Sequence, residues 1–454
     1  MTIRFDDSLP TLIKIISLEL GPDALSSGTV LRDVSGKLAF FSASELDDKK
    51  IETLADKLRG RLGHYGRSDR IVVSKNDFGA EQIRNDPTAF ELTIEGHRIR
   101  LVDRRLVGAD WLRRPSDFAP PPPRIVFSSL KGGVGRSTAL AVVAGDLASR
   151  GYRVLAIDLD VEAPGLGPML LQEDTLPEFG ILDALVENGI SGLDESFYAD
   201  LVGPSVLSKG RGRIDVIPVL GRRSLKNPAD VLTKIARAYV EDITDDGKID
   251  TFMDQIRILV DDFAATKRYD VILVDARAGL HETTAAAIMG LGAEVFLFGG
   301  DEAQTFQGFK VLLAHLARFV EPNKPRPEWL SRLTIVQGQA PQDTDKRVAF
   351  ADKCQTIISE VGLGQNQASI QPVITPTDSF TDIPWNDDIP DEEVLPVDEF
   401  KIRGPVAVLD DPRFRGFDPL VRRDLLSEQL YQSSFGGLLE QVDNCFLPET
   451  ENKD

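Results

Sequence analysis

One stretch of the chain, residues 125–144, constrains the fold more than any other. An apolar run leads into the loop Leu130-Lys131-Gly132-Gly133-Val134-Gly135, and an alanine-rich helical segment follows. Glycines let backbone N–H groups approach phosphate oxygens, and a helix N-terminus adds a partial positive charge. The stretch therefore predicts a phosphate-binding loop between a strand and a helix. The residues predicted to bind a nucleotide there are Gly132, Gly133, Val134, Gly135, Arg136, Ser137 and Thr138.

Three side chains after the glycines suit a nucleotide and its metal. Ser137 follows the cationic position, where a hydroxyl can ligate Mg²⁺, and Thr138 can donate to the α-phosphate. Arg136 stands where phosphate loops usually carry lysine. An arginine keeps the charge and can clamp phosphate with two N–H groups, but it is bulkier than lysine. We expect nucleotide binding to survive this exchange, and the rate of hydrolysis stays open.

From Arg124 onward, apolar strand candidates alternate with helical segments. Near-continuous apolar runs are typical of parallel strands that are covered on both faces. The alternation predicts an α/β domain with a doubly wound, mostly parallel sheet, in which nucleotides bind beyond the carboxyl ends of the strands. The strand candidates are residues 124–130, 153–160, 213–220, 270–276, 294–299 and 333–338.

Carboxylates follow two of these strands. Asp158 and Asp160 are two residues apart at a strand end, so their side chains point the same way. Asp275 follows the apolar run 271–274, as in a Walker B strand, and is predicted to hold Mg²⁺ through water. The alternative for Asp158 and Asp160 is that they merely cap a loop.

Further on, Arg277, His281 and Glu282 flank Gly279. They can distinguish ATP from ADP, or they can simply begin a helix. The sequence leaves these two interpretations open.

The motif Lys131-Gly132-Gly133-Val134-Gly135-Arg136-Ser137 resembles the ParA/MinD family of ATPases, whose deviant Walker A motif is K-G-G-x-G-K-[ST]. The resemblance covers about residues 124–390 and departs from the family at Arg136. It implies ATP and Mg²⁺ as ligands and a dimer in which Lys131 reaches phosphates bound by the other subunit. In that scheme Lys131, Arg136 and Asp160 are the catalytic residues.

The same resemblance assigns further positions. Asp158 would help organise the Mg²⁺ region with Ser137 and Asp275, and Asp160 would orient the attacking water. Gln337 stands where the family often has an asparagine that contacts adenine, and residues 383–387 resemble a late segment near the base. Glu162 is a candidate contact to a partner subunit.

The prolines at 120–123 suggest how the chain is divided, because consecutive prolines form a stiff, extended segment. We predict a small N-terminal α+β adaptor domain (1–117), a proline-rich linker (118–123), the ATPase domain (124–395) and a C-terminal helical extension (396–454). In the first domain we expect strands at 38–41 and 70–73, a helix at 44–62 and a hairpin over 90–103. In the last part we expect a helix from 425 towards 442, with a break at Gly436-Gly437 left open.

Charge and composition limit the class of function. The net charge is −20, whereas residues 1–123 carry 19 basic and 19 acidic side chains, so the excess acidity lies after residue 123. Such acidity argues against general binding to nucleic-acid phosphates. Two cysteines, Cys354 and Cys445, make no disulfide framework, and no apolar run reaches the ~18–20 residues of a membrane span. We therefore expect a cytoplasmic protein without a membrane anchor.

Three functional hypotheses remain. The first is an ATP-hydrolysing switch that forms a homodimer around nucleotide and regulates a protein partner. The second, less favoured because of the acidity, is a DNA-associated partition ATPase. The third is a regulatory subunit of a multi-gene bacterial system, such as a defence system, with weak or no hydrolysis; Arg136 is the residue that favours it.

Overall fold

The structure is a computed structural model that describes residues 3–105, 107–207, 212–243, 249–321, 324–364 and 401–446. The chain folds into two compact units. The first comprises Met1–Arg114 with Asp250–Asp254, and the second comprises Pro115–Ile249 with Gln255–Asp454. Each unit has its own sheet and core.

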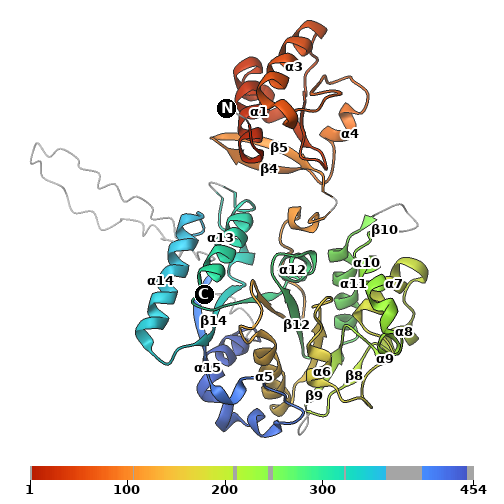
Figure 1. Cartoon of the computed structure of the whole chain (residues 1–454), viewed down its shortest axis with the longest axis vertical. Helices are drawn as coiled ribbons and strands as arrows, with labels where there is room; N and C mark the ends of the chain where they lie inside the picture. The colour runs from red at the N-terminus through yellow and green to blue at the C-terminus, as the bar shows by residue number, and fades with distance from the viewer. Residues whose placement is uncertain are drawn as a thin grey trace, which may run out of the picture. The chain divides into compact units, whose positions relative to one another are not determined.

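The first unit is a five-stranded sheet with helices on both faces (Figure 1). Helices α1 and α3 pack on one face and the short α4 on the other. The strand order is β3-β2-β1-β5-β4, with β1 parallel to β5. The elements are α1 (Phe5–Leu20), α2 (Pro22–Ser27), β1 (Thr29–Arg32), β2 (Leu38–Phe41), α3 (Asp48–Leu62), β3 (Val72–Val73), α4 (Ala80–Arg84), β4 (Phe90–Ile94) and β5 (His97–Asp103).

The α+β prediction for this unit is confirmed, including the hairpin of β4 and β5, but α1 was not expected. This helix buries Leu9, Leu12, Ile13 and Ile16, which follow helical spacing. Two local signals are unfavourable: Pro10 lies inside the helix, and Arg4 at the N-cap makes no side-chain capping bond. The burial of these apolar side chains against the sheet therefore outweighs the weak helix-forming tendency of the local sequence.

The second unit contains an eight-stranded sheet in the order β15-β14-β13-β6-β12-β7-β9-β8. All neighbouring strands pair in parallel except β8, which is antiparallel to β9. The doubly wound α/β prediction is confirmed. The strands are β6 (Arg124–Ser129), β7 (Arg153–Asp158), β8 (Gly203–Pro204), β9 (Arg213–Ile217), β12 (Val271–Ala278), β13 (Glu294–Gly299), β14 (Leu333–Ala340) and β15 (Arg403–Leu409).

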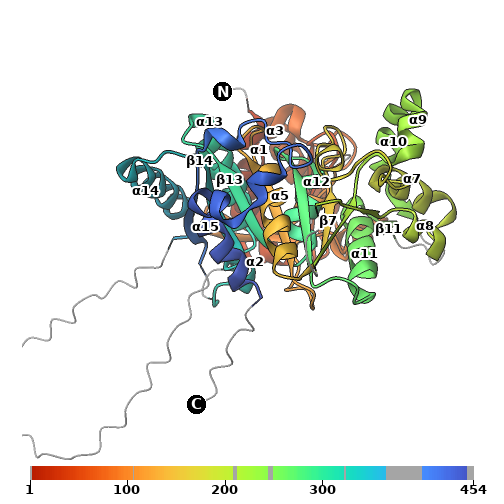
Figure 2. The same ribbon diagram turned by 90° about the horizontal axis from the view of Figure 1, so that it is seen from below.

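Helices cover both faces of this sheet (Figure 1). Helix α5 is buried from Ala139 to Ala148, since the sheet lies on one side of it and α15 on the other. Helices α7 to α10 gather on one side of this unit (Figure 2). The helices are α5 (Arg136–Ser149), α6 (Leu166–Leu170), α7 (Ile181–Ser191), α8 (Glu195–Ala199), α9 (Arg222–Lys226), α10 (Val231–Ala238), α11 (Phe252–Ala265), α12 (Glu282–Ala285), α13 (Ala303–Ala317), α14 (Thr344–Glu360) and α15 (Glu428–Asn444).

The C-terminal part differs from the expected helical extension. Strand β15 pairs in parallel with β14, so residues 403–409 belong to the central sheet. Helix α15 continues through Gly436 and Gly437 without a break. A Cβ at Gly437 would lie 3.5 Å from Val406 Cγ1, an ordinary van der Waals separation, so this face of α15 packs directly on β15. Close packing on β15 explains why these glycines do not end the helix.

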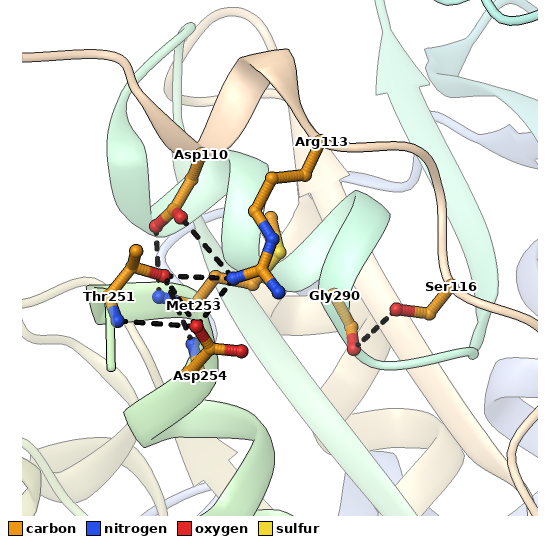
Figure 3. A network of polar contacts seen from close by, with 7 residues as sticks. All are labelled: Asp110, Arg113, Ser116, Thr251, Met253, Asp254 and Gly290. Atoms are coloured by element: carbon orange, nitrogen blue, oxygen red, sulfur yellow. Dashed lines mark hydrogen bonds and ion pairs between the residues drawn. The ribbon is translucent and has the colours of Figure 1, made fainter. Parts of the chain in front are cut away.

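The predicted linker is residues 118–123, and hydrogen bonds of Ser116, just before it, and of Ala119, within it, join this part of the chain to the second unit. The Ser116 hydroxyl donates to Gly290 O at 3.1 Å (Figure 3). The Ser116 amide donates to Met289 O at 2.7 Å, and the Ala119 amide donates to Gly292 O at 2.9 Å. That residues 1–117 act as a separate adaptor domain stays a prediction.

A compact ion pair network lies within the first unit. Arg113 Nη1 donates to Thr251 Oγ1 at 3.1 Å and to Asp254 Oδ2 at 2.6 Å, while Asp110 Oδ2 accepts from the Met253 amide at 2.9 Å (Figure 3). These bonds explain why Asp250–Asp254 groups with the N-terminal residues.

None of the described helices is long and apolar enough to span a membrane.

The contact between α15 and α5 gives a stability prediction. Tyr431 is buried, and its hydroxyl donates to Asp146 Oδ1 at 2.7 Å. Tyr431→Phe should lower the free energy of unfolding by about 1–3 kcal/mol, because a buried carboxylate loses a donor. Urea denaturation measures the change. Tyr152→Phe is the matched control, since none of the hydrogen bonds found among the described residues uses that hydroxyl; equal losses in both variants would contradict the prediction.

Candidate functional site

Strand register brings the predicted site together. Strand β12 lies between β6 and β7, and its Asp275 is level with Phe127 on one side and Asp158 on the other. The carboxyl ends of these parallel strands therefore meet at one edge of the sheet, next to the loop that joins β6 to α5. This is the edge at which open α/β sheets bind ligands.

The loop conformation requires glycine at two positions. Gly133 has φ 79° and Gly135, the N-cap of α5, has φ 82°, values that side chains other than glycine rarely adopt. No described heavy atom lies within 4 Å of where a Cβ would stand at Gly132, Gly133 or Gly135. The loop therefore turns its backbone towards open space, as a phosphate cradle needs.

Arg136, Ser137, Asp160 and Asp275 contact one another directly. Ser137 Oγ donates to Asp275 Oδ2 at 2.6 Å, and Arg136 Nε lies 2.6 Å from Asp275 Oδ1. Arg136 Nη2 lies 3.4 Å from Asp160 Oδ2. The side chains of Arg136, Asp160 and Asp275 are only 10%, 11% and 2% exposed, so these charges interact away from bulk water.

Burial governs the protonation of the two strand-end carboxylates. It raises the pKa of Asp275, whereas Arg136 and Ser137 act in the opposite direction. Burial, followed by the charge of Asp275, raises the pKa of Asp158 to about 7. Two adjacent buried carboxylates do not readily ionise together.

Asp158 supports the loop that follows β7. Its Oδ1 accepts from the Asp160 amide at 3.0 Å, and its Oδ2 accepts from the amides of Gly165 and Leu166 at 3.2 and 2.9 Å. Backbone amides thus use both oxygens, as in the loop-capping alternative. The predicted role of Asp158 in organising the Mg²⁺ region stays a prediction.

Two other predicted residues lie apart from that cluster. Lys131 is partly exposed and forms an ion pair with Glu302, the N-cap residue of α13. Gln337 lies within β14, before Gly338 and Gln339, and is 2% exposed, so its predicted contact with a base stays a prediction. Residues 383–387 lie outside the described residues.

The end of β14 also supports the phosphate loop from behind. Gln339 Nε2 donates to Gly133 O at 2.9 Å, and a Cβ at Gly338 would lie 2.1 Å from Val134 O. Sequence reasoning missed both residues, because the only signal was their position just after Gln337. Gly338 and Gln339 link the C-terminal part of β14 to the backbone of the phosphate loop.

A second polar cluster surrounds Glu162. Its Oε1 accepts from Tyr239 at 2.5 Å and lies 2.6 Å from Arg277 Nη1 and 3.6 Å from His281 Nε2. His281 is the N-cap residue of α12, and Glu282 begins that helix. Burial lowers the pKa of His281 and raises that of Tyr239. Tyr239 was missed, since it joins the cluster only through the tertiary fold.

No group of three or more histidine, cysteine, aspartate or glutamate side chains forms a metal cluster in the part of the chain that the structure describes. Of the three residues predicted at the metal, Ser137 and Asp275 touch, whereas both oxygens of Asp158 accept from backbone amides. Ser137 and Asp275 offer one hydroxyl and one carboxylate. That composition fits Mg²⁺, which usually keeps several waters and takes few protein ligands.

These features define a P-loop nucleotide-binding domain. A central parallel strand leads into a glycine loop with two residues at positive φ, a buried helix follows, and the adjacent strand supplies a carboxylate. Comparison with family models agrees. Residues 125–336 match the family model of the CobQ/CobB/MinD/ParA nucleotide binding domain. The predicted resemblance to ParA/MinD-type P-loop ATPases is confirmed.

Solved structures with partial likeness include the MinD cell division protein of Aquifex aeolicus, at 16% identity and a TM-score of 0.41 over 72% of this chain and 98% of that one. A ParA family ATPase from Chlorobium tepidum TLS has 22% identity and a TM-score of 0.35 over 53% and 82% of the two chains. Cobyrinic acid a,c-diamide synthase from Mycobacterium smegmatis, with bound ADP and magnesium, has 17% identity and a TM-score of 0.33 over 51% and 80%. A comparison with curated proteins gives no significant match.

The contact behind the loop gives a prediction. Gly338→Ala should lower the free energy of unfolding by about 1–3 kcal/mol, because the new Cβ would overlap Val134 O and push the loop outward. Chemical denaturation measures the loss. Gly404→Ala in β15 is the matched control, since no described atom lies within 4 Å of its Cβ position. If both variants are equally stable, the close approach at Gly338 is not a constraint.

Proposed function

We propose that this protein binds ATP with Mg²⁺ at the loop 131–138 and hydrolyses it as a cytoplasmic molecular switch. The observation that carries the proposal is the convergence of Arg136, Ser137, Asp160 and Asp275 beside an open glycine loop. The match of residues 125–336 to the model of a nucleotide binding domain supports nucleotide binding.

The residues present fit a magnesium nucleotide. Ser137 and Asp275 supply oxygen atoms of the hard type that Mg²⁺ prefers. Asp275 Oδ2 accepts from the Ser137 hydroxyl, and Asp275 Oδ1 is buried in an ion pair with Arg136 Nε at 2.6 Å. Bound there, Mg²⁺ would neutralise charge on the phosphate oxygens. Backbone amides of Gly132–Gly135 would hold the phosphates, Thr138 would donate to the α-phosphate, and Gln337 would lie towards the base.

Hydrolysis needs a group that orients water. Asp160 has one oxygen, Oδ1, that is buried without a hydrogen-bond partner, and its other oxygen faces Arg136. We assign Asp160 to the attacking water and Arg136 to the phosphates, because phosphoryl transfer depends on positioning and charge stabilisation.

We further propose that nucleotide bridges two copies of the chain and that the dimer regulates a protein partner. Lys131 supports this step, since it is partly exposed and pairs with Glu302, which is exposed as well. An exposed ion pair is weak and can be exchanged for a phosphate. A regulatory subunit with slow hydrolysis is the second candidate, because Arg136 is engaged with two carboxylates.

Calorimetry tests the binding step. The full chain should bind ATP with Mg²⁺, and Asp275→Asn should weaken this binding about tenfold or more by removing a metal ligand. Asp270→Asn is the control, since Asp270 precedes the same strand at its opposite end and pairs with Arg153. Absence of binding by the folded wild-type chain would refute the proposal.

Turnover separates the two candidate functions. Asp160→Asn should reduce ATP hydrolysis about 100-fold or more while ATP binding stays near the wild-type value, because the lost group orients water. Phosphate release and calorimetry measure the two quantities. Wild-type turnover no faster than that of the variant would favour the regulatory subunit.

Sizing in ADP, ATP and a non-hydrolysable ATP analogue tests the dimer. We expect dimers only with a triphosphate, and their loss in Lys131→Ala, because that lysine would contact phosphates across the interface. Lys310→Ala is the control, since Lys310 is a partly exposed lysine of α13 that pairs with Glu360. A size that does not depend on nucleotide would contradict the dimer.

A further inference from the structure

The guanidinium of Arg136 occupies the space between two carboxylates that the proposed function assigns to metal and water. Its Nε lies 2.6 Å from Asp275 Oδ1, and its Nη2 lies 3.4 Å from Asp160 Oδ2. Nη1 is buried with no hydrogen-bond partner among the described residues, so the group is not fully satisfied by protein alone. A cation held this way has spare capacity for an anion.

The same contacts leave little room for a divalent cation. Ser137 Oγ uses Asp275 Oδ2, and Arg136 faces Asp275 Oδ1, so both oxygens of that carboxylate are engaged. A metal ion at this carboxylate would stand next to the guanidinium, and two nearby cations repel each other strongly in a site that is largely removed from water. The metal and the present position of Arg136 are therefore mutually exclusive.

Arginine suits this position better than the lysine that is usual in such loops. A guanidinium presents N–H groups in a planar fork and can face two carboxylates at once, whereas an ammonium is a compact point charge. Buried carboxylates also need a positive partner, since an unpaired buried charge is strongly unfavourable. Arg136 supplies that partner when no nucleotide is bound.

We propose that Arg136 is an internal counter-ion that closes the site to divalent metal until a polyphosphate draws the guanidinium away. The inference rests on the proposed function and specifies its regulation: metal enters only together with the nucleotide. Phosphate oxygens replace Asp160 and Asp275 as partners of Arg136, and this exchange releases Asp275 for the metal. Arg136 and Asp275 each keep a partner of opposite charge both before and after the exchange.

The test uses Mn²⁺ alone, in the absence of nucleotide, with free Mn²⁺ followed by electron paramagnetic resonance. The wild-type full chain should show no saturable Mn²⁺ site. Arg136→Gln and Arg136→Met should each gain one, with an apparent affinity for Mn²⁺ about tenfold or more above that of the wild-type chain, because a neutral side chain removes the repulsion between the two cations. Asp275→Asn added to either variant should abolish the gain. Arg153→Gln, which removes an exposed arginine paired with Asp270, should behave as the wild type.

Thermal melting gives a second readout that a merely structural ion pair would not produce. Mn²⁺ should raise the Tm of the two neutral Arg136 variants and leave that of the wild type unchanged, because only a metal bound to the folded state stabilises it. Saturable Mn²⁺ binding by the wild-type chain would overturn the inference without any variant. So would neutral variants that fold and bind Mn²⁺ no better than the wild type.

The outcome is separable from that of the proposed function. If wild-type protein fails to bind ATP with Mg²⁺ while the neutral variants gain a Mn²⁺ site, the nucleotide assignment falls and the counter-ion role stands. If ATP binds but wild-type protein also binds Mn²⁺ alone, the counter-ion role falls and the nucleotide assignment stands.

Discussion

The insertion of β12 between β6 and β7 is the constraint on which the site depends. Register places Asp275 level with Asp158 on one neighbour and with Phe127, just before the glycine loop, on the other. Since side chains of parallel strands in register share a face, two carboxylates and the start of a helix are forced together. The loop residues then have only to turn their amides outward.

This arrangement concentrates charge where the protein has little water. Burying an ionised carboxylate without a partner costs free energy, and in this protein each buried carboxylate has its own set of partners. Backbone amides satisfy Asp158, whereas Asp275 is held by a hydroxyl and a guanidinium. The first set is fixed by the backbone, but the second consists of side chains that can rotate. A ligand can therefore reorganise the environment of Asp275 without disturbing the strand below it.

Local sequence patterns predicted the parts of the molecule that local chemistry determines. The apolar runs located six strands of the large sheet, and the glycine loop located the site. What could not be predicted depends on contacts far apart in the chain. Residues 403–409 are identified as a strand only by their pairing with β14. Glu302 belongs to the site only through its ion pair with Lys131, and Gln339 only through its hydrogen bond to Gly133 O. The predicted roles of individual residues at the nucleotide site remain to be tested.

The last described segment has a consequence for how the chain reaches its folded state. Residues 401–446 supply the outermost strand next to β14 and the helix that covers α5, with Leu426 packed 3.2 Å from the Cβ position of Gly145. Until this segment emerges from the ribosome, α5 keeps an uncovered apolar face and β14 an unpaired edge, which are both aggregation hazards. The apolar cover of α5, the helix that begins at the phosphate loop, therefore forms only after residues 401–446 have been synthesised.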